Sequence, residues 1–189
     1  AETRSAYADG RNGVAWGGLA GLGDLSKTVQ WHIETLYSGT AGCAESNAWL
    51  TAFVQQAPEA WDLLIQLLSA GAATTDAVKF FSCQGLYLKL SDANARGNDV
   101  WKSCSNTGVR HKLLSTAFSM LTTSTPASPL VGRRLCLLLV HLFLRIGLTE
   151  DWRDPIGDVF RALSSQSSIR WLVEILALLP VELENNRYC

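Results

Sequence analysis

Histidine and cysteine are the residues of this sequence best suited to bind a metal or to act in catalysis. The three histidines, His32, His111 and His141, lie far apart, and none has a second metal-type ligand three or four residues away. The sequence contains no CxxC, HExxH or GxSxG motif, although zinc sites and serine hydrolases commonly show such spacings. The residues therefore predict no metal, no cofactor and no enzyme activity.

The segment GGLAGLG at residues 17–23 has the composition of a phosphate-binding loop but not its spacing. It does not match GxGxxG, no strand pattern precedes it, and no GK[ST] follows, whereas nucleotide-binding loops need that context. We predict that residues 1–26 are a flexible, glycine-rich leader. One alternative stays open: an enzyme or ligand-binding helical bundle built around this leader, whose activity would be lost on deletion of residues 1–26.

The pattern of cysteines favours a reducing compartment. Cys83 and Cys136 lie in apolar helical runs, where a free cysteine behaves as a small hydrophobic residue. The remaining cysteines are Cys43, Cys104 and Cys189. An odd number of cysteines without a CxxC motif argues against a disulfide framework.

Charge and hydropathy argue against direct binding to nucleic acid or insertion into a membrane. The net charge is −1, which gives no bulk attraction to nucleic acid. The longest apolar run, LCLLLVHLFL at residues 135–144, spans ten residues and includes His141, whereas a membrane-spanning helix needs about 20 residues. We therefore expect a buried core helix in which His141 has a polar partner.

From residue 27 onward, apolar residues recur at helical spacing, and no stretch alternates convincingly as a strand would. The first stretch, for example, places Val29, Ile33 and Leu36 on one face. Eight such stretches form four pairs that recur about every 35–45 residues, interrupted by a polar loop at residues 91–109. This spacing predicts an all-α fold over residues 27–189, a right-handed α-α superhelix of about four HEAT- or armadillo-like hairpins. A plain helical bundle would show similar periods and remains the alternative.

The sequence pattern of residues 47–91 resembles the first repeats of the importin-β superfamily. In that family, a helix of the form xxWLxxFQxS is followed at once by xAWxxxxxLL, and the next helix carries the signature FFAAQTLxxKI. The residues that match these patterns are Trp49, Leu50, Phe53, Gln55, Ala60, Trp61, Leu67, Leu68, Phe80, Phe81, Gln84, Leu86 and Lys89. Gly85 stands where the family usually has threonine.

The second half of the chain resembles the transportin-SR branch of that superfamily. The branch typically reads VxxQLCxALAxLAL, then W and P, then LLEILxxLPEE. The matching residues are Leu135, Cys136, Leu138, Trp152, Pro155, Glu174, Ile175, Leu176, Leu179, Pro180 and Glu182. Arg133 and Arg134 stand where a Thr-Gln or similar pair is common. The resemblance covers residues 28–187, and the order and spacing of the motifs carry it.

This resemblance implies the N-terminal part of a nuclear transport receptor that shuttles between cytoplasm and nucleus. In the family, the concave second helices of the N-terminal repeats bind Ran in its GTP form. Protein cargo, for which Arg/Ser-rich segments are one candidate, binds mostly farther along, and the full-length receptors also meet nucleoporins. A generic HEAT or armadillo scaffold that never meets Ran is the alternative.

Polar positions on the second helix of each pair are the expected partner-binding residues. They are Asn47, Lys79, Lys89, Arg133, Arg134 and Arg170. Lys79 and Lys89 lie ten positions apart on one predicted helix, which places them on roughly the same side. Gln84 lies between them in an apolar run, and we expect its amide to bond a neighbouring repeat, because a buried unpaired amide costs about 1–3 kcal/mol.

Overall fold

The computed structural model describes residues 22–39, 41–91, 107–123, 128–146 and 154–186. Within these ranges the chain forms eight α-helices, one 3-10 turn and no strand. The helices are α1 (Leu22–Ser38), α2 (Cys43–Gln56), α3 (Ala60–Ser69), α4 (Asp76–Ser91), α6 (Thr107–Thr122), α7 (Pro129–Ile146), α8 (Pro155–Leu163) and α9 (Ile169–Asn186), with the 3-10 turn η2 (Gly71–Ala73) between α3 and α4. The predicted all-α fold is therefore confirmed.

The first helix begins earlier than the sequence indicated. α1 starts at Leu22, so the predicted leader boundary at residue 26 is wrong, and residues 1–21 lie outside the described residues. The reason is that Leu25 extends the apolar stripe of Val29 and Ile33 by one helical turn, and all three side chains are buried. The predicted loop at 91–109 is bounded by the end of α4 and the start of α6, and residues 92–106 are not described.

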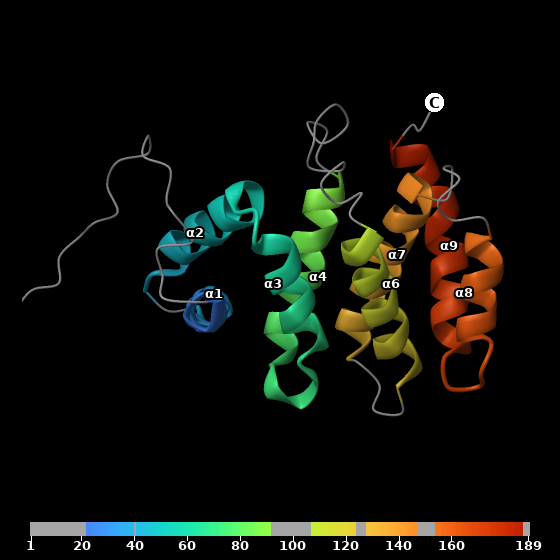
Figure 1. Ribbon diagram of the computed structural model, residues 1–189, viewed down its shortest axis with the longest axis horizontal. Coiled ribbons are helices and arrows are strands. Elements are labelled where there is room, and N and C mark those ends of the chain that lie inside the picture. The colour runs from blue at the N-terminus through green and yellow to red at the C-terminus, as the bar shows by residue number, and fades with distance from the viewer. Residues whose placement is uncertain (1–21, 40, 92–106, 124–127, 147–153, 187–189) are drawn as a thin grey trace, which may run out of the picture.

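The helices pack as hairpins in the order of the chain. α1 packs on α2, α3 on α4, α6 on α7, and α8 on α9, and the pairs follow one another from left to right in Figure 1. Successive hairpins then meet helix by helix: α4 packs on α7 and α7 on α9, while α3 packs on α6 and α6 on α8. Two layers result from α3 onward, with α4, α7 and α9 in one layer and α3, α6 and α8 in the other.

One apolar core runs through all four hairpins. α3 is almost wholly buried because seven of its ten residues are buried. α7 is buried along most of its length, since neighbours cover it on both flanks and on its hairpin side. The largest fully buried side chains come from α1, α2, α3, α4, α6 and α7, among them Phe53, Ile33, Leu64, Leu86, Leu113 and Leu138.

Glycines inside two helices allow close packing between the hairpins. On α7, a Cβ atom built at Gly132 would lie 2.1 Å from Cη2 of Trp171, so the indole ring of α9 occupies the space of a side chain. On α4, a Cβ at Gly85 would lie 3.0 Å from Cδ1 of Leu64. A side chain at position 85 would therefore crowd this contact between α4 and α3.

The buried cysteines give a prediction about thiol reactivity. Cys83 and Cys136 are buried and free. Burial raises the pKa of Cys136 to about 12 and also raises the pKa of Cys83. Because only an accessible thiolate reacts readily, iodoacetamide should leave both thiols unmodified in the native protein and modify them in denaturant, as read by peptide mass spectrometry. Cys43 is only partly buried and should react before Cys83 and Cys136; native-state modification of Cys83 would contradict the packing.

Candidate protein-binding hollow

A hollow opens where α4, α7 and α9 meet. Its floor and walls combine apolar side chains with two arginines and one acid. The lining residues are Phe80 of α4, Leu130, Arg133, Arg134 and Leu137 of α7, and Leu178 and Glu182 of α9. Two of the three arginines predicted as partner-binding residues, Arg133 and Arg134, therefore line this hollow together with the ring of Phe80.

Arg134 lies over an aromatic platform. Its guanidinium carbon is 5.2 Å from the centroid of the Phe80 ring, and Tyr37 of α1 meets that ring edge-on at 6.3 Å between centroids. Burial raises the pKa of Tyr37, and the charge of Arg134 acts in the opposite direction. The ring attracts the cation without using its N–H groups as a carboxylate would, so a partner's carboxylate remains a suitable ligand for Arg134.

Arg133 makes an ion pair across the α7–α9 seam. Its Nε lies 2.9 Å from Oε1 of Glu174, and 72% of the arginine side chain is exposed. Exposed pairs of this kind contribute about 0–1 kcal/mol. Exchanging Glu174 for a carboxylate of a bound partner would therefore cost little, which makes Arg133 available for recognition despite its internal pairing.

Glu182, which lines the hollow, is hydrogen-bonded to the buried side chain of His141. His141 is fully buried, and its Nε2 lies 2.7 Å from Oε2 of Glu182. The ring of Tyr87 approaches the imidazole edge-on at 4.4 Å between centroids. The predicted core histidine with a polar partner is thus confirmed, and the partner is an acid from the last helix.

The side chain of Lys89 bonds within the protein and does not line the hollow. Its Nζ donates to the backbone oxygen of Val54 at 2.5 Å and lies 5.6 Å from the centroid of the Trp61 ring. A carbonyl in the last turn of a helix has no intrahelical partner, so this lysine satisfies one at the end of α2. Lys89 therefore joins α2, α3 and α4, and its expected role in partner binding gains no support from its position.

The sequence predicted that the amide of Gln84 bonds a neighbouring repeat, and this prediction is wrong for the amide oxygen. Oε1 of Gln84 is buried and has no hydrogen-bond partner. The bond between hairpins that the sequence assigned to Gln84 is made instead by Lys89, whose longer side chain reaches across to α2. The glutamine side chain is one carbon shorter than the lysine side chain, so its polar end reaches less far.

The other predicted residues do not gather at the hollow. Asn47 is exposed on α2, and Lys79 is half-buried on α4 outside the lining residues. Arg170 is exposed at the start of α9, where its guanidinium carbon lies 4.1 Å from the centroid of the Trp171 ring. Their roles in binding remain predictions. Sequence reasoning missed Tyr37 as part of the site, because no local pattern links α1 with α7.

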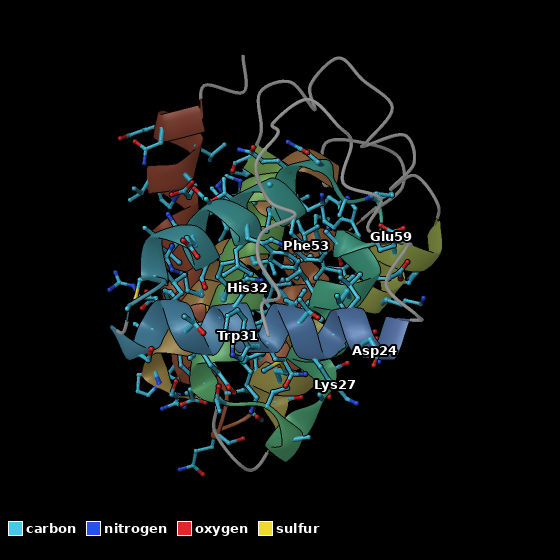
Figure 2. The ribbon with its side chains drawn as sticks, turned by 90° about the vertical axis from the view of Figure 1, so that its left-hand side faces the viewer. Asp24, Lys27, Trp31, His32, Phe53 and Glu59 are labelled. Atoms are coloured by element: carbon cyan, nitrogen blue, oxygen red, sulfur yellow. The ribbon has the colours of Figure 1, made fainter. Side chains whose placement is uncertain are left out.

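Aromatic packing covers the N-terminal end of the structure, which Figure 2 shows with Trp31 and His32 on α1 and Phe53 on α2. His32 stacks on Trp49 at 4.1 Å and meets Trp31 edge-on at 4.7 Å between centroids. Its Nδ1 lies 3.2 Å from Oγ of Ser46, and burial lowers its pKa. These contacts make His32 part of a ring stack. Among the described residues no three potential metal ligands cluster.

None of the helices in the described ranges is both long enough and apolar enough to cross a membrane. Neither the models of known protein families nor the curated proteins include a match to this chain.

Proposed function

We propose that this chain is a protein-binding array of helical hairpins, wound as a right-handed superhelix of the HEAT kind. We further propose that it forms the N-terminal part of a nuclear transport receptor and binds Ran in its GTP form. The observation that carries the proposal is the hollow between α4, α7 and α9, which presents Arg133 and Arg134 beside Phe80. The sequential packing of the hairpins supports the array.

The hollow is suited to recognise a protein surface that presents a carboxylate next to an apolar side chain. Arginine binds carboxylates through two parallel N–H groups, and the walls contributed by Leu130, Leu137 and Leu178 can cover an aliphatic or aromatic neighbour. Because three successive hairpins contribute to the hollow, a bound partner would bias their relative orientation. Cargo that prefers another orientation would then be coupled to the first partner by linkage.

The test is a comparison of binding to GTP-loaded and GDP-loaded Ran. We expect binding to the GTP form alone, and the double charge reversal Arg133→Glu with Arg134→Glu, both in the hollow, should weaken it at least tenfold, or about 1.4 kcal/mol. Arg134→Glu should have an effect of the same direction. Calorimetric titration measures the affinity, and circular dichroism should show unchanged helicity.

Lys112→Glu provides a matched control for these reversals. Lys112 lies on α6 in the opposite layer, and it is exposed and paired with Asp62 at 3.3 Å. It therefore changes the net charge by the same amount per site without touching the hollow. Equal weakening by Lys112→Glu would assign the effect to bulk charge, and unaltered affinity in the hollow variants would remove those residues from the binding site.

A generic hairpin scaffold is the second candidate, and one observation favours it. Two of the six predicted contact residues already have internal partners, Lys89 at Val54 and Arg133 at Glu174. A scaffold of this kind would bind an acidic peptide or protein in the same hollow and would ignore the nucleotide on Ran. Equal or absent binding to both forms of Ran, with the hollow variants still defective for an acidic peptide, identifies this case.

A further inference from the structure

The C-terminal hairpin exposes an apolar face. On α9, five residues at helical spacing lie on one side and are exposed: Ile169, Val173, Leu176, Pro180 and Leu183. Their steps of four, three, four and three residues form the narrow stripe of a helix that packs on another helix. Val173 is 60% exposed and Leu176 is 49% exposed, so the described helices leave this stripe uncovered.

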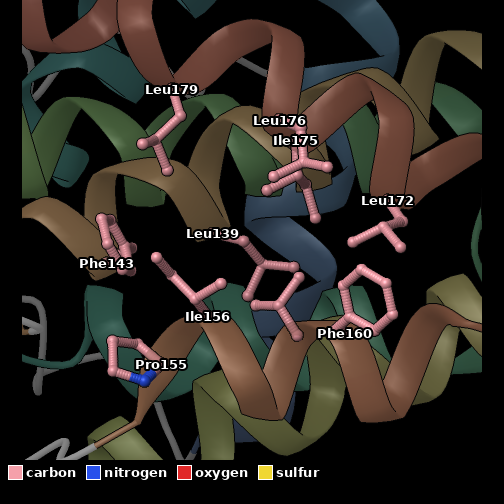
Figure 3. Close-up of a pocket in the computed structure, with 10 residues that line it drawn as sticks. Leu139, Phe143, Pro155, Ile156, Phe160, Leu172, Ile175, Leu176 and Leu179 are labelled. Carbon is pink, nitrogen blue, oxygen red and sulfur yellow. The ribbon is translucent and has the colours of Figure 1, made fainter.

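The face extends from α9 onto α8. Ile156 and Phe160 of α8 are both more than half exposed. Figure 3 shows them beside Leu176 and Leu179, around a shallow apolar groove between the two helices. Contiguous exposed apolar surface of this kind marks interaction sites.

We propose that a second copy of this chain covers this face, with the two α9 helices packed antiparallel about a two-fold axis. Such an interface uses the same patch on both copies. In this register Leu176 of one copy meets Pro180 of the other, and Val173 meets Leu183. Ala177, next to the stripe and exposed, meets Ala177 of the second copy, and its small side chain lets the helices approach closely.

Charge complementarity selects the antiparallel arrangement. Arg170 near the start of α9 and Glu184 near its end are both exposed and lie on the same side of the apolar stripe. Antiparallel packing brings Arg170 of each copy next to Glu184 of the other, which makes two pairs of opposite charge. Parallel packing about a two-fold axis would place the two Arg170 residues on opposite sides of the interface, and likewise the two Glu184 residues, so these pairs of opposite charge could not form.

The association is tested by sedimentation equilibrium on the 189-residue chain. We expect a reversible dimer, and Leu176→Asp should raise the dimer dissociation constant at least tenfold, because it places a charge at the centre of the apolar stripe. Leu88→Asp is the matched control, since Leu88 of α4 is also 49% exposed but lies on another helix. A wild-type chain that stays monomeric, or equal effects of the two substitutions, would overturn the proposal.

The register is tested by charge exchange at the ends of the stripe. Arg170→Glu and Glu184→Arg should each weaken the dimer, since each places like charges together twice. The double variant Arg170→Glu/Glu184→Arg should restore the wild-type dissociation constant. Failure of the double variant to restore it would exclude the antiparallel pairing, and circular dichroism of every variant excludes unfolding as the cause. Neither test involves Ran, so failure of the dimer can be distinguished from failure of the proposed transport function.

Discussion

Replacing Gly132 with alanine should lower the free energy of unfolding by about 1–3 kcal/mol, the usual cost of overfilling a packed core. Alanine normally stabilises a helix interior by about 1 kcal/mol relative to glycine, so the expected effect has the opposite sign. The reason is the ring of Trp171, whose Cη2 and Cζ2 atoms lie 2.1 and 2.5 Å from the position of the new Cβ. The ring is buried at this seam, and it cannot move without separating α7 from α9.

Urea unfolding followed by circular dichroism measures this change, and the chain offers a matched control. Gly108 is also helical, in α6, and a Cβ built there meets no atom within 4 Å. Gly108→Ala should therefore leave stability unchanged or raise it. Trp171→Leu in the Gly132→Ala background should recover part of the loss, because the smaller side chain leaves room for the methyl group. If Gly132→Ala behaves like Gly108→Ala, the ring does not lie on the glycine.

Replacing Glu182 with alanine should lower the free energy of unfolding by about 1–3 kcal/mol, the cost of leaving a buried polar group without its partner. The group is Nε2 of His141, which is fully buried and faces Oε2 of Glu182 at 2.7 Å. Glu182→Gln keeps an oxygen acceptor opposite Nε2 and should recover most of the loss. Chemical unfolding at pH 7 measures all three proteins.

Glu174→Ala is the control for this substitution. Glu174 lies on the same helix and also has a basic partner, but that partner, Arg133, is 72% exposed, whereas His141 is fully buried. Exposed pairs contribute about 0–1 kcal/mol, so this variant should remain close to the wild type. Because alanine favours a helix at least as much as glutamate does, helix propensity cannot cause a loss, and equal losses at both sites would mean that burial of the His141–Glu182 pair does not determine the effect.

The sequence predicted those features of the fold that depend on local spacing. The stripe of Val29 and Ile33 identified a helix and its buried side, and His141 was correctly placed in the core because its neighbours are all apolar. The start of α1 was missed because the glycines before Leu25 hid the first turn. The free-energy cost of a glycine in the first helical turn is small compared with the gain from burying the next turn. Packing against the rest of the protein therefore outweighed the low helix propensity of the glycines.

The contacts between hairpins could not be predicted in the same way. Trp171 lies on Gly132, which is far away in the sequence, and no periodicity records that pairing. The candidate site shows the same limit: Arg133 and Arg134 were found because they stand out in an apolar helix. Phe80 lines the hollow only because α4 packs on α7, and Tyr37 meets the Phe80 ring only because α1 packs on α4. Lys89 was assigned to the surface from its charge, although its long stem carries the amine inward to Val54.

The order in which the hairpins pack has a consequence for how the chain comes apart. Each described helix pair meets mainly the pairs before and after it, so most contacts join segments that are close along the chain. Structures with local contacts of this kind form quickly and can open one unit at a time. The two outer pairs can therefore fray and re-form while α4 and α7, which have neighbours on both sides, hold the remaining molecule together.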